Sequence, residues 1–193
     1  MVDRDGELLA CAEGLSREAE QVLADLGLPE LFTPIGRVEL VGSAAFGLAL
    51  KQDIDLDVLC ASLNPGMIWD VLRPLAGHPR VKKLRWSNEH GGFNGTGRSE
   101  ADGFSCGIHY DAGEVRDALR WDVDCWFFPM SAPRPDIALR DRVRVASPEE
   151  RLAILRLKDA AIRSGRNGRS GDYQGYRIYE AVLDRGVRRL DDM

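Results

Sequence analysis

The spacing of hydrophobic positions along the chain predicts both helices and strands. Apolar residues that recur every three or four positions mark amphipathic helices, and apolar residues that alternate with polar ones mark strands. Helical spacing is found at 5–26, 65–77, 148–163 and 173–185, and strand-like segments are found at 37–41, 53–60, 81–86, 104–110 and 121–128. This order predicts an α/β (α+β) protein with a mixed β-sheet and flanking helices, followed by a short C-terminal helical segment.

Residues that favour turns and helix ends subdivide this pattern. Gly14 and Ser16 predict a break or a new start within the first helix, and Gly27 predicts its end. Loops are expected at 29–34, 88–103 and 164–171, a turn of small residues at 42–47, and a proline-containing linker after residue 128. Ser147, followed by proline and by glutamate three positions on, is typical of a capped helix N-terminus. We therefore expect an αβ core at residues 1–146 and a helical segment at 147–193.

Composition and charge narrow the class of protein. The 193 residues include 26 Lys and Arg and 31 Asp and Glu, a net charge of −5, so no long nucleic acid is expected as a partner. No apolar run is long enough to span a bilayer, and the first residues are too charged for a signal peptide, which predicts a cytoplasmic protein without a membrane partner. Cys60, Cys106 and Cys125 lie in apolar strand-like segments without metal-ligand spacing, so we expect buried free thiols.

The stretch from Val41 to Asp57 carries the most informative chemistry. Asp53, Asp55 and Asp57 alternate with apolar residues, so they share one strand face, with successive side chains about 6 to 7 Å apart. Like charges at this distance repel unless a cation neutralises them, and a hard divalent ion such as Mg²⁺ takes oxygen ligands. Gly42 and Ser43 form a turn of small residues whose N–H groups suit phosphate oxygens.

A second acidic strand offers a third carboxylate. Asp122 and Asp124 lie on the same face of the segment 121–128, and periodicity alone does not choose between them. We favour Asp124 because it lies deeper in the apolar run, where an aspartate is costly to bury without a partner. The candidate metal ligands are therefore two of the three aspartates of the first strand, together with Asp124.

These residues resemble the nucleotidyltransferase superfamily typified by DNA polymerase beta, in particular its small bacterial members. The resemblance covers residues 37–128 and rests on the order of Gly42-Ser43, then Asp53-Ile54-Asp55, then a later strand aspartate. It implies that Asp53, Asp55 and Asp124 hold Mg²⁺ in a two-metal site and act in catalysis. It also implies that the Gly-Ser turn contacts the triphosphate of an NTP such as ATP. A helical C-terminal part is common in the same family.

Other interpretations of the same residues remain open. Asp55 and Asp57 also satisfy the Asp-x-Asp pattern, and the alternating aspartates can instead be the solvated face of an edge strand. Lys158 lies mid-helix, from where its ammonium can reach a phosphate of the nucleotide or extend to solvent. Tyr176 and Tyr179 fit the core and rim of the last helix better than a platform for bases.

The predicted function is the transfer of a nucleoside monophosphate from an NTP to an acceptor by two-metal catalysis. The acceptor is expected to be a small molecule or a protein side chain. Two alternatives use the same fold: a non-catalytic module that binds a nucleotide or a partner, and a metal-dependent phosphohydrolase with water as the acceptor. The sequence does not identify the acceptor, the preferred nucleotide or the oligomeric state.

Overall fold

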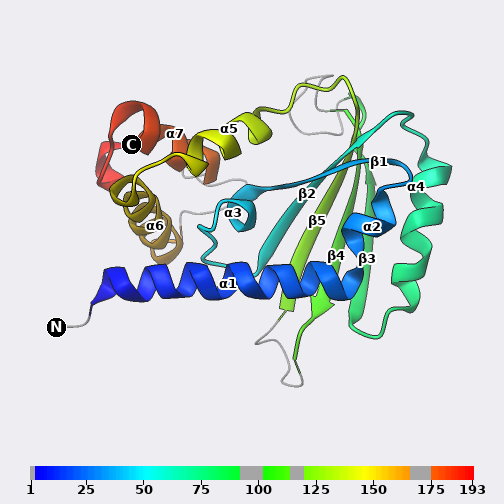
Figure 1. Ribbon diagram of the computed structural model, residues 1–193, viewed down its shortest axis with the longest axis horizontal. Coiled ribbons are helices and arrows are strands. Elements are labelled where there is room, and N and C mark those ends of the chain that lie inside the picture. Colours follow the sequence, from blue (N-terminus) through cyan, green and yellow to red (C-terminus); the bar gives the residue numbers. More distant parts are fainter. Residues whose placement is uncertain (1–2, 92–101, 114–119, 166–174) are drawn as a thin grey trace.

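A computed structural model describes residues 3–91, 102–113, 120–165 and 175–193 (Figure 1). Its centre is a five-stranded sheet in the order β1-β2-β5-β4-β3. The strands are β1 (Gly36–Val41), β2 (Asp53–Cys60), β3 (Val81–Asn88), β4 (Phe104–Asp111) and β5 (Arg120–Pro129). β2 and β5 pair in parallel, and the other neighbours are antiparallel. The mixed sheet with flanking helices confirms the predicted fold class.

Three N-terminal helices cover one face of the sheet. They are α1 (Arg4–Leu26), α2 (Leu28–Phe32) and α4 (Pro65–Leu72), which continues into the 3-10 helix η1 (Arg73–Gly77). Apolar residues of these helices form one buried cluster with alternate residues of the strands, among them Ile54 and Leu56 of β2 and Val123 and Cys125 of β5. The alternation in β2 and β5 therefore directs one set of side chains into this core and the other set to the opposite face.

The C-terminal helices form a second buried cluster, in which the start of α1 takes part. The helices are α5 (Pro135–Arg144), α6 (Pro148–Arg163), α7 (Gly175–Arg185) and the 3-10 helix η4 (Leu190–Asp192). Leu8 and Ala12 of α1 pack with residues of α6 and α7, including Ile154 and Ile178. Figure 1 shows these helices gathered near the N-terminal end of α1. The division at residue 147 stays a prediction.

Several predicted boundaries are confirmed, and four expectations are wrong. β2 spans the predicted residues, and the capping box of Ser147 and Glu150 is present. The break in α1 does not occur: the helix is continuous, and the Ser16 hydroxyl donates back to the Ala12 carbonyl at 2.8 Å instead of capping a new helix. The expected loop, turn and linker each contain a helix: α2, the four-residue α3 (Gly42–Ala45) and α5.

Proline explains two of these differences. Pro29 and Pro135 each occupy the first turn of a helix, where the missing N–H has no intrahelical partner in any case. Three expectations lie wholly or largely outside the described residues. They are the loop at 88–103, the connection at 164–171 and the start of the last helix at Tyr173. None of the helices in the described ranges combines the length and hydropathy needed to cross a bilayer.

Candidate active site

The parallel pairing of β2 and β5 brings the candidate carboxylates together. In this register Asp55 lies opposite Asp124, and Asp53 lies opposite Asp122. One oxygen of each of Asp53, Asp55 and Asp124 lies within 4.8 Å of the other two. The structure thus places the three carboxylates in one group, on the face away from the helix-covered core, while their role as metal ligands stays a prediction.

The electrostatics of this group favour a cation. Burial, followed by the charges of Asp124 and Asp122, raises the pKa of Asp53 above its ordinary value. One cation near the group is Arg85, whose Nη2 lies 3.8 Å from Asp124 Oδ1 and whose side chain is 58% exposed. The donors are all carboxylate oxygens, which are the ligands that Mg²⁺ prefers. The group therefore fits Mg²⁺ in both charge and ligand chemistry.

The structure gives a second reason for a glycine at position 42, in addition to the phosphate contact expected from the sequence. Its φ of +68° lies in the left-handed region, which side-chain-bearing residues rarely adopt. A Cβ at this position would lie 2.0 Å from Asp55 Oδ2. Glycine thus gives space to the Asp55 carboxylate, between the end of β1 and the start of α3. Ser43 follows Gly42, and both residues line a cavity together with Asp55.

Lys158 lies in the site as a buried cation. Its side chain comes from α6, is only 7% exposed as a residue, and donates from Nζ to the Leu48 carbonyl at 2.5 Å. A second contact, of 3.3 Å, joins Nζ to the Tyr179 hydroxyl on α7. Burial lowers the pKa of Lys158 to about 8, against the opposing effect of Asp53 and Asp55. The interpretation in which the Lys158 ammonium extends to solvent is therefore wrong, because the ammonium is buried.

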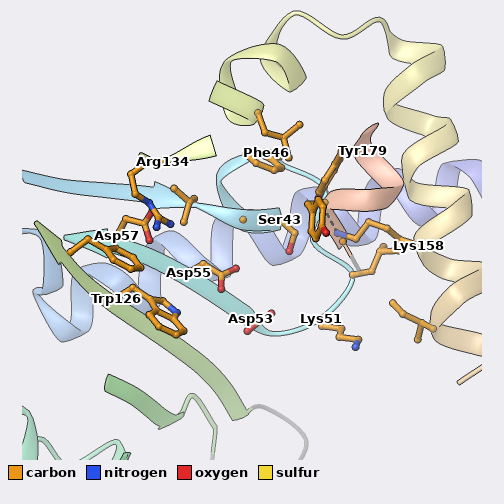
Figure 2. A pocket seen from close by; sticks show the side chains of 18 residues that line it. Ser43, Phe46, Lys51, Asp53, Asp55, Asp57, Trp126, Arg134, Lys158 and Tyr179 are labelled. Atoms are coloured by element: carbon orange, nitrogen blue, oxygen red, sulfur yellow. Dashed lines mark hydrogen bonds and ion pairs between the residues drawn. The ribbon is translucent and has the colours of Figure 1, made fainter. Parts of the chain in front are cut away.

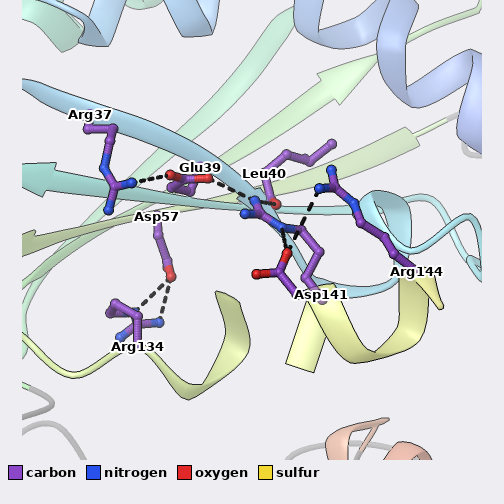
Figure 3. Close-up of polar contacts among 8 residues, drawn as sticks. Arg37, Glu39, Leu40, Asp57, Arg134, Asp141 and Arg144 are labelled. Carbon is purple, nitrogen blue, oxygen red and sulfur yellow. Dashed lines mark hydrogen bonds and ion pairs between the residues drawn. The ribbon is translucent and has the colours of Figure 1, made fainter. Parts of the chain in front are cut away.

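The remaining aspartates of the two strands pair with cations or histidine of the chain. Asp57 is 1% exposed, and its Oδ2 lies 2.7 Å from Arg134 Nη2 (Figure 3). Asp122 Oδ1 lies 3.2 Å from His109 Nδ1 and 3.3 Å from Arg120 Nε. The oxygens of Asp57 and Asp122 therefore lie outside the group of three, which separates Asp57 from the otherwise equivalent Asp53 and Asp55.

Helix α5 carries Arg134 at its N-terminal end and is anchored to β1. Arg140 Nη1 donates to Glu39 Oε2 at 2.8 Å and to the Leu40 carbonyl at 3.2 Å. The Arg134 guanidinium carbon also lies 4.0 Å from the centre of the Phe128 ring. Arg134 was not expected at the site, because its partner Asp57 is 77 positions away in sequence. Trp126 and Phe128 were not expected there either, although strand alternation places them on the face of Asp124.

Asp53, Asp55 and Asp57 line a cavity of about 470 Å³ between β2, β5 and the C-terminal helices (Figure 2). Asp124 lies next to Asp53 and Asp55 but is not one of the residues that line this cavity. Lys158 and Tyr179 line one end, and Arg134, Trp126 and Phe128 line the other. Val41, Gly42, Ser43, Phe46, Leu50, Lys51, Leu139, Ile162, Gly175 and Tyr176 complete the described wall. The volume is within the range of small-molecule sites.

Comparison with known proteins identifies the fold. No protein-family model matches the chain, and no curated protein matches it significantly. Among solved structures, the Cid1 poly(U) polymerase bound to MgATP aligns with a TM-score of 0.65 and 19% identity, over 89% of this chain and 50% of that chain. A cytoplasmic RNA terminal U-transferase aligns with a TM-score of 0.60 and 20% identity, over 87% and 45%.

The polymerase core of TRAMP, an RNA surveillance complex, aligns with a TM-score of 0.51 and 15% identity, over 95% of this chain and 50% of that chain. The chain spans about half the length of these structures. At these identities the likeness concerns the fold, which is that of the DNA polymerase beta-like nucleotidyltransferases.

Proposed function

We propose that the protein is a Mg²⁺-dependent nucleotidyltransferase that transfers a nucleoside monophosphate from an NTP, such as ATP, to an acceptor hydroxyl. The observation that carries this proposal is the convergence of the Asp53, Asp55 and Asp124 carboxylates within 4.8 Å at a cavity of the nucleotidyltransferase fold. In this proposal the three carboxylates hold two Mg²⁺ ions, which when bound neutralise phosphate charge and activate the attacking oxygen.

The reaction forms one bond and breaks another. The acceptor oxygen attacks the α-phosphorus, the bond between that phosphorus and the bridging oxygen to the β-phosphate breaks, and pyrophosphate leaves with the bonding electron pair. The proton of the acceptor hydroxyl passes to a carboxylate of the group, which we assign to Asp124. Attack and departure are in line, so acceptor and pyrophosphate occupy opposite sides of the α-phosphorus.

Lys158, Gly42 and Ser43 are assigned to the phosphates of the nucleotide. Lys158 offers a buried ammonium that donates hydrogen bonds to the oxygens of Leu48 and Tyr179, and a charged phosphate oxygen would be a stronger acceptor for it. The Gly42-Ser43 turn lies beside Asp55 and opens on the same cavity. We therefore assign the triphosphate to the Lys158 end of the cavity.

The acceptor is proposed to be a small molecule or a protein side chain. The net charge of −5 does not favour a long polyanion. Similar structures of the Cid1 poly(U) polymerase contain MgATP, the UTP analogue UMPNPP or the short product ApU. An RNA hydroxyl is therefore the acceptor against which small molecules and proteins should be compared. Acceptor panels should therefore include short RNA beside small molecules and proteins.

Labelled NTP tests the proposal against its alternatives. The protein is incubated with Mg²⁺, an acceptor panel and an NTP labelled in the α-phosphate, and pyrophosphate and the labelled products are measured. Label on an acceptor with equimolar pyrophosphate is the expected result. Labelled free monophosphate with no acceptor product would instead identify a phosphohydrolase, and saturable NTP binding without turnover would identify a binding module. Asp55→Asn is the control for contaminating activity.

A further inference from the structure

We propose that Trp126 is a stacking platform for a planar ring of the acceptor, so that the acceptor is a hydroxyl compound carrying an aromatic or heteroaromatic group. This inference rests on the proposed function and concerns the end of the cavity opposite Lys158. Trp126 lines the cavity together with Phe128 and Arg134. Figure 2 shows the indole beside Asp57, across the carboxylates from Lys158.

The packing of Trp126 leaves one ring face toward the carboxylates. The Trp126 and Phe128 rings are stacked, with an interplanar angle of 4° and centroids 5.7 Å apart. Residues 124, 126 and 128 follow one another on the same strand face. Because Phe128 covers the side of the indole toward the strand end, the other side is directed toward Asp124. A ring stacked there would bring its substituents to the metal-binding group.

The platform is held in place by buried contacts. The guanidinium carbon of Arg134 lies 4.0 Å from the centre of the Phe128 ring, on which Trp126 stacks. Arg134 in turn donates from Nε to Asp57 Oδ2 at 2.8 Å. The Asp57 side chain in this ion pair is 2% exposed. A platform that is rigid before binding loses little side-chain entropy when a ligand stacks on it. Asp57 and Arg134 are thus positioning residues.

The geometry of in-line transfer assigns this platform to the acceptor and not to the nucleotide. Lys158, whose buried ammonium we assign to the phosphates, lies at the other end of the cavity. A pyrophosphate that departs toward Lys158 requires the attacking oxygen to arrive from the opposite side. That side is the Trp126 end of the same cavity. Aromatic side chains stack on nucleic-acid bases with little preference among them, because every base has a π-face.

Binding of adenosine to the nucleotide-loaded protein tests the inference. The full chain is first saturated with Mg²⁺ and a non-hydrolysable ATP analogue, and adenosine or ribose is then titrated while calorimetry and tryptophan fluorescence are recorded. We expect saturable adenosine binding and no ribose binding at the same concentrations. Trp126→Ala should weaken adenosine binding by roughly ten-fold or more, the range for losing one stacked ring, and Trp126→Phe should retain most of it.

Two further variants separate stacking from a general disturbance. Trp69→Phe, on α4 over the other sheet face, is the matched control and should leave the affinity of adenosine unchanged. Arg134→Lys keeps a cation beside Asp57 but removes the planar group over Phe128, so it should weaken adenosine binding a few-fold without changing the affinity for the ATP analogue.

The possible results distinguish failure of the inference from failure of the function. Absence of adenosine binding to a loaded wild-type protein overturns the acceptor platform and leaves nucleotidyl transfer in place. If Trp126→Ala weakens binding of the ATP analogue instead of adenosine, the platform serves the base of the nucleotide and the inference is wrong. If the analogue does not bind the wild-type protein at all with Mg²⁺, both proposals are overturned.

Discussion

The two ends of the cavity each present a cation beside an aromatic ring, but the cations are compensated differently. At one end, Lys158 Nζ lies 5.6 Å from the centre of the Tyr179 ring and hydrogen-bonds to neutral oxygens. At the other end, Arg134 lies over the Phe128 ring and pairs with the carboxylate of Asp57 (Figures 2 and 3). The first cation has a lowered pKa, and the second has its counter-charge built into the fold.

We propose that this difference separates a binding group, Lys158, from a structural one, Arg134. A buried ion without a charged partner destabilises the free protein and gains when an anionic ligand arrives, whereas a buried ion pair contributes to the folded state and gains nothing from a ligand. The same reasoning divides the aspartates of β2. Asp53 and Asp55 share a group of carboxylates that favours a metal, while Asp57 is neutralised by Arg134.

Arg134→Met should have the largest effect on stability. The substitution leaves the Asp57 carboxylate buried without its cation, which costs about 3–5 kcal/mol of unfolding free energy. Arg37→Met is the matched control, because Arg37 is 59% exposed and its pair with Glu39 contributes about 0–1 kcal/mol. Urea unfolding of the two variants would measure both. Equal small losses would show that the Asp57 pair is not structural.

Asp55→Asn should behave in the opposite way. Removing one of three crowded carboxylates relieves repulsion, so the metal-free protein should be as stable as the wild type or slightly more so. Mg²⁺ at 100 times its Kd should stabilise the wild type by about 2.7 kcal/mol and the variant by far less. Thermal unfolding with and without Mg²⁺ makes the comparison. A large loss of stability in the metal-free variant would mean that Asp55 is structural.

Lys158→Met should weaken binding of Mg²⁺–NTP by roughly 10- to 100-fold, since a hydrogen bond to a charged group contributes about 1.5–3 kcal/mol. Titration calorimetry at pH 7 measures this loss. The wild-type affinity should also decline as the pH rises through about 8, where Lys158 loses its proton. A nucleotide affinity that does not change in the variant would remove Lys158 from the binding site.

The lowered pKa of Lys158 should also make the unfolding free energy of the ligand-free protein depend on pH, in a direction that can be stated. The folded pKa of Lys158 is about 8, below the ordinary value of 10.5, so the unfolded chain binds more protons between these pH values. The unfolding free energy of the wild type should therefore increase relative to Lys158→Met as the pH rises from 8 to 10.5. A constant difference between the two proteins across this window would contradict the lowered pKa.

Gly42→Ala should have a modest effect on stability and a selective effect on the metal. The left-handed backbone costs an alanine about 1–2 kcal/mol. Gly186→Ala is the control, because its φ is +66° but nothing lies within 4 Å of its added Cβ. Only the Gly42 variant should also lose Mg²⁺ affinity, since its Cβ displaces Asp55. Equal Mg²⁺ binding by both variants would contradict this contact.

The strands and their faces could be predicted from local sequence, but the long-range partners could not. The alternation of Asp53, Ile54 and Asp55 predicts both the span of β2 and the sharing of one face, because a strand has a fixed period of two. Helix α5 was missed because the prolines at 129, 133 and 135 indicate a linker. The ion pair of Arg140 with Glu39, which anchors the helix, joins residues 101 positions apart.

The choice between neighbouring aspartates illustrates the same limit. Depth in an apolar run favoured Asp124 over Asp122, and the parallel register places Asp124 opposite Asp55. The pairing of Asp57 with Arg134, 77 positions away, has no local signal in either segment. Sequence therefore identified the acidic strand face, and tertiary structure gathered Asp53, Asp55 and Asp124 into one group while it paired Asp57 with Arg134.

Titration of Mn²⁺ in place of Mg²⁺, followed by electron paramagnetic resonance with a non-hydrolysable ATP analogue present, tests the central claim most directly. The account predicts saturable Mn²⁺ binding to the wild-type protein that depends on the analogue. It also predicts that Asp55→Asn strongly weakens this binding while Asp122→Asn leaves it nearly unchanged, because the Asp122 carboxylate lies with His109 and Arg120. Equal Mn²⁺ binding by the wild type and Asp55→Asn would contradict the assignment of the metal to Asp53, Asp55 and Asp124.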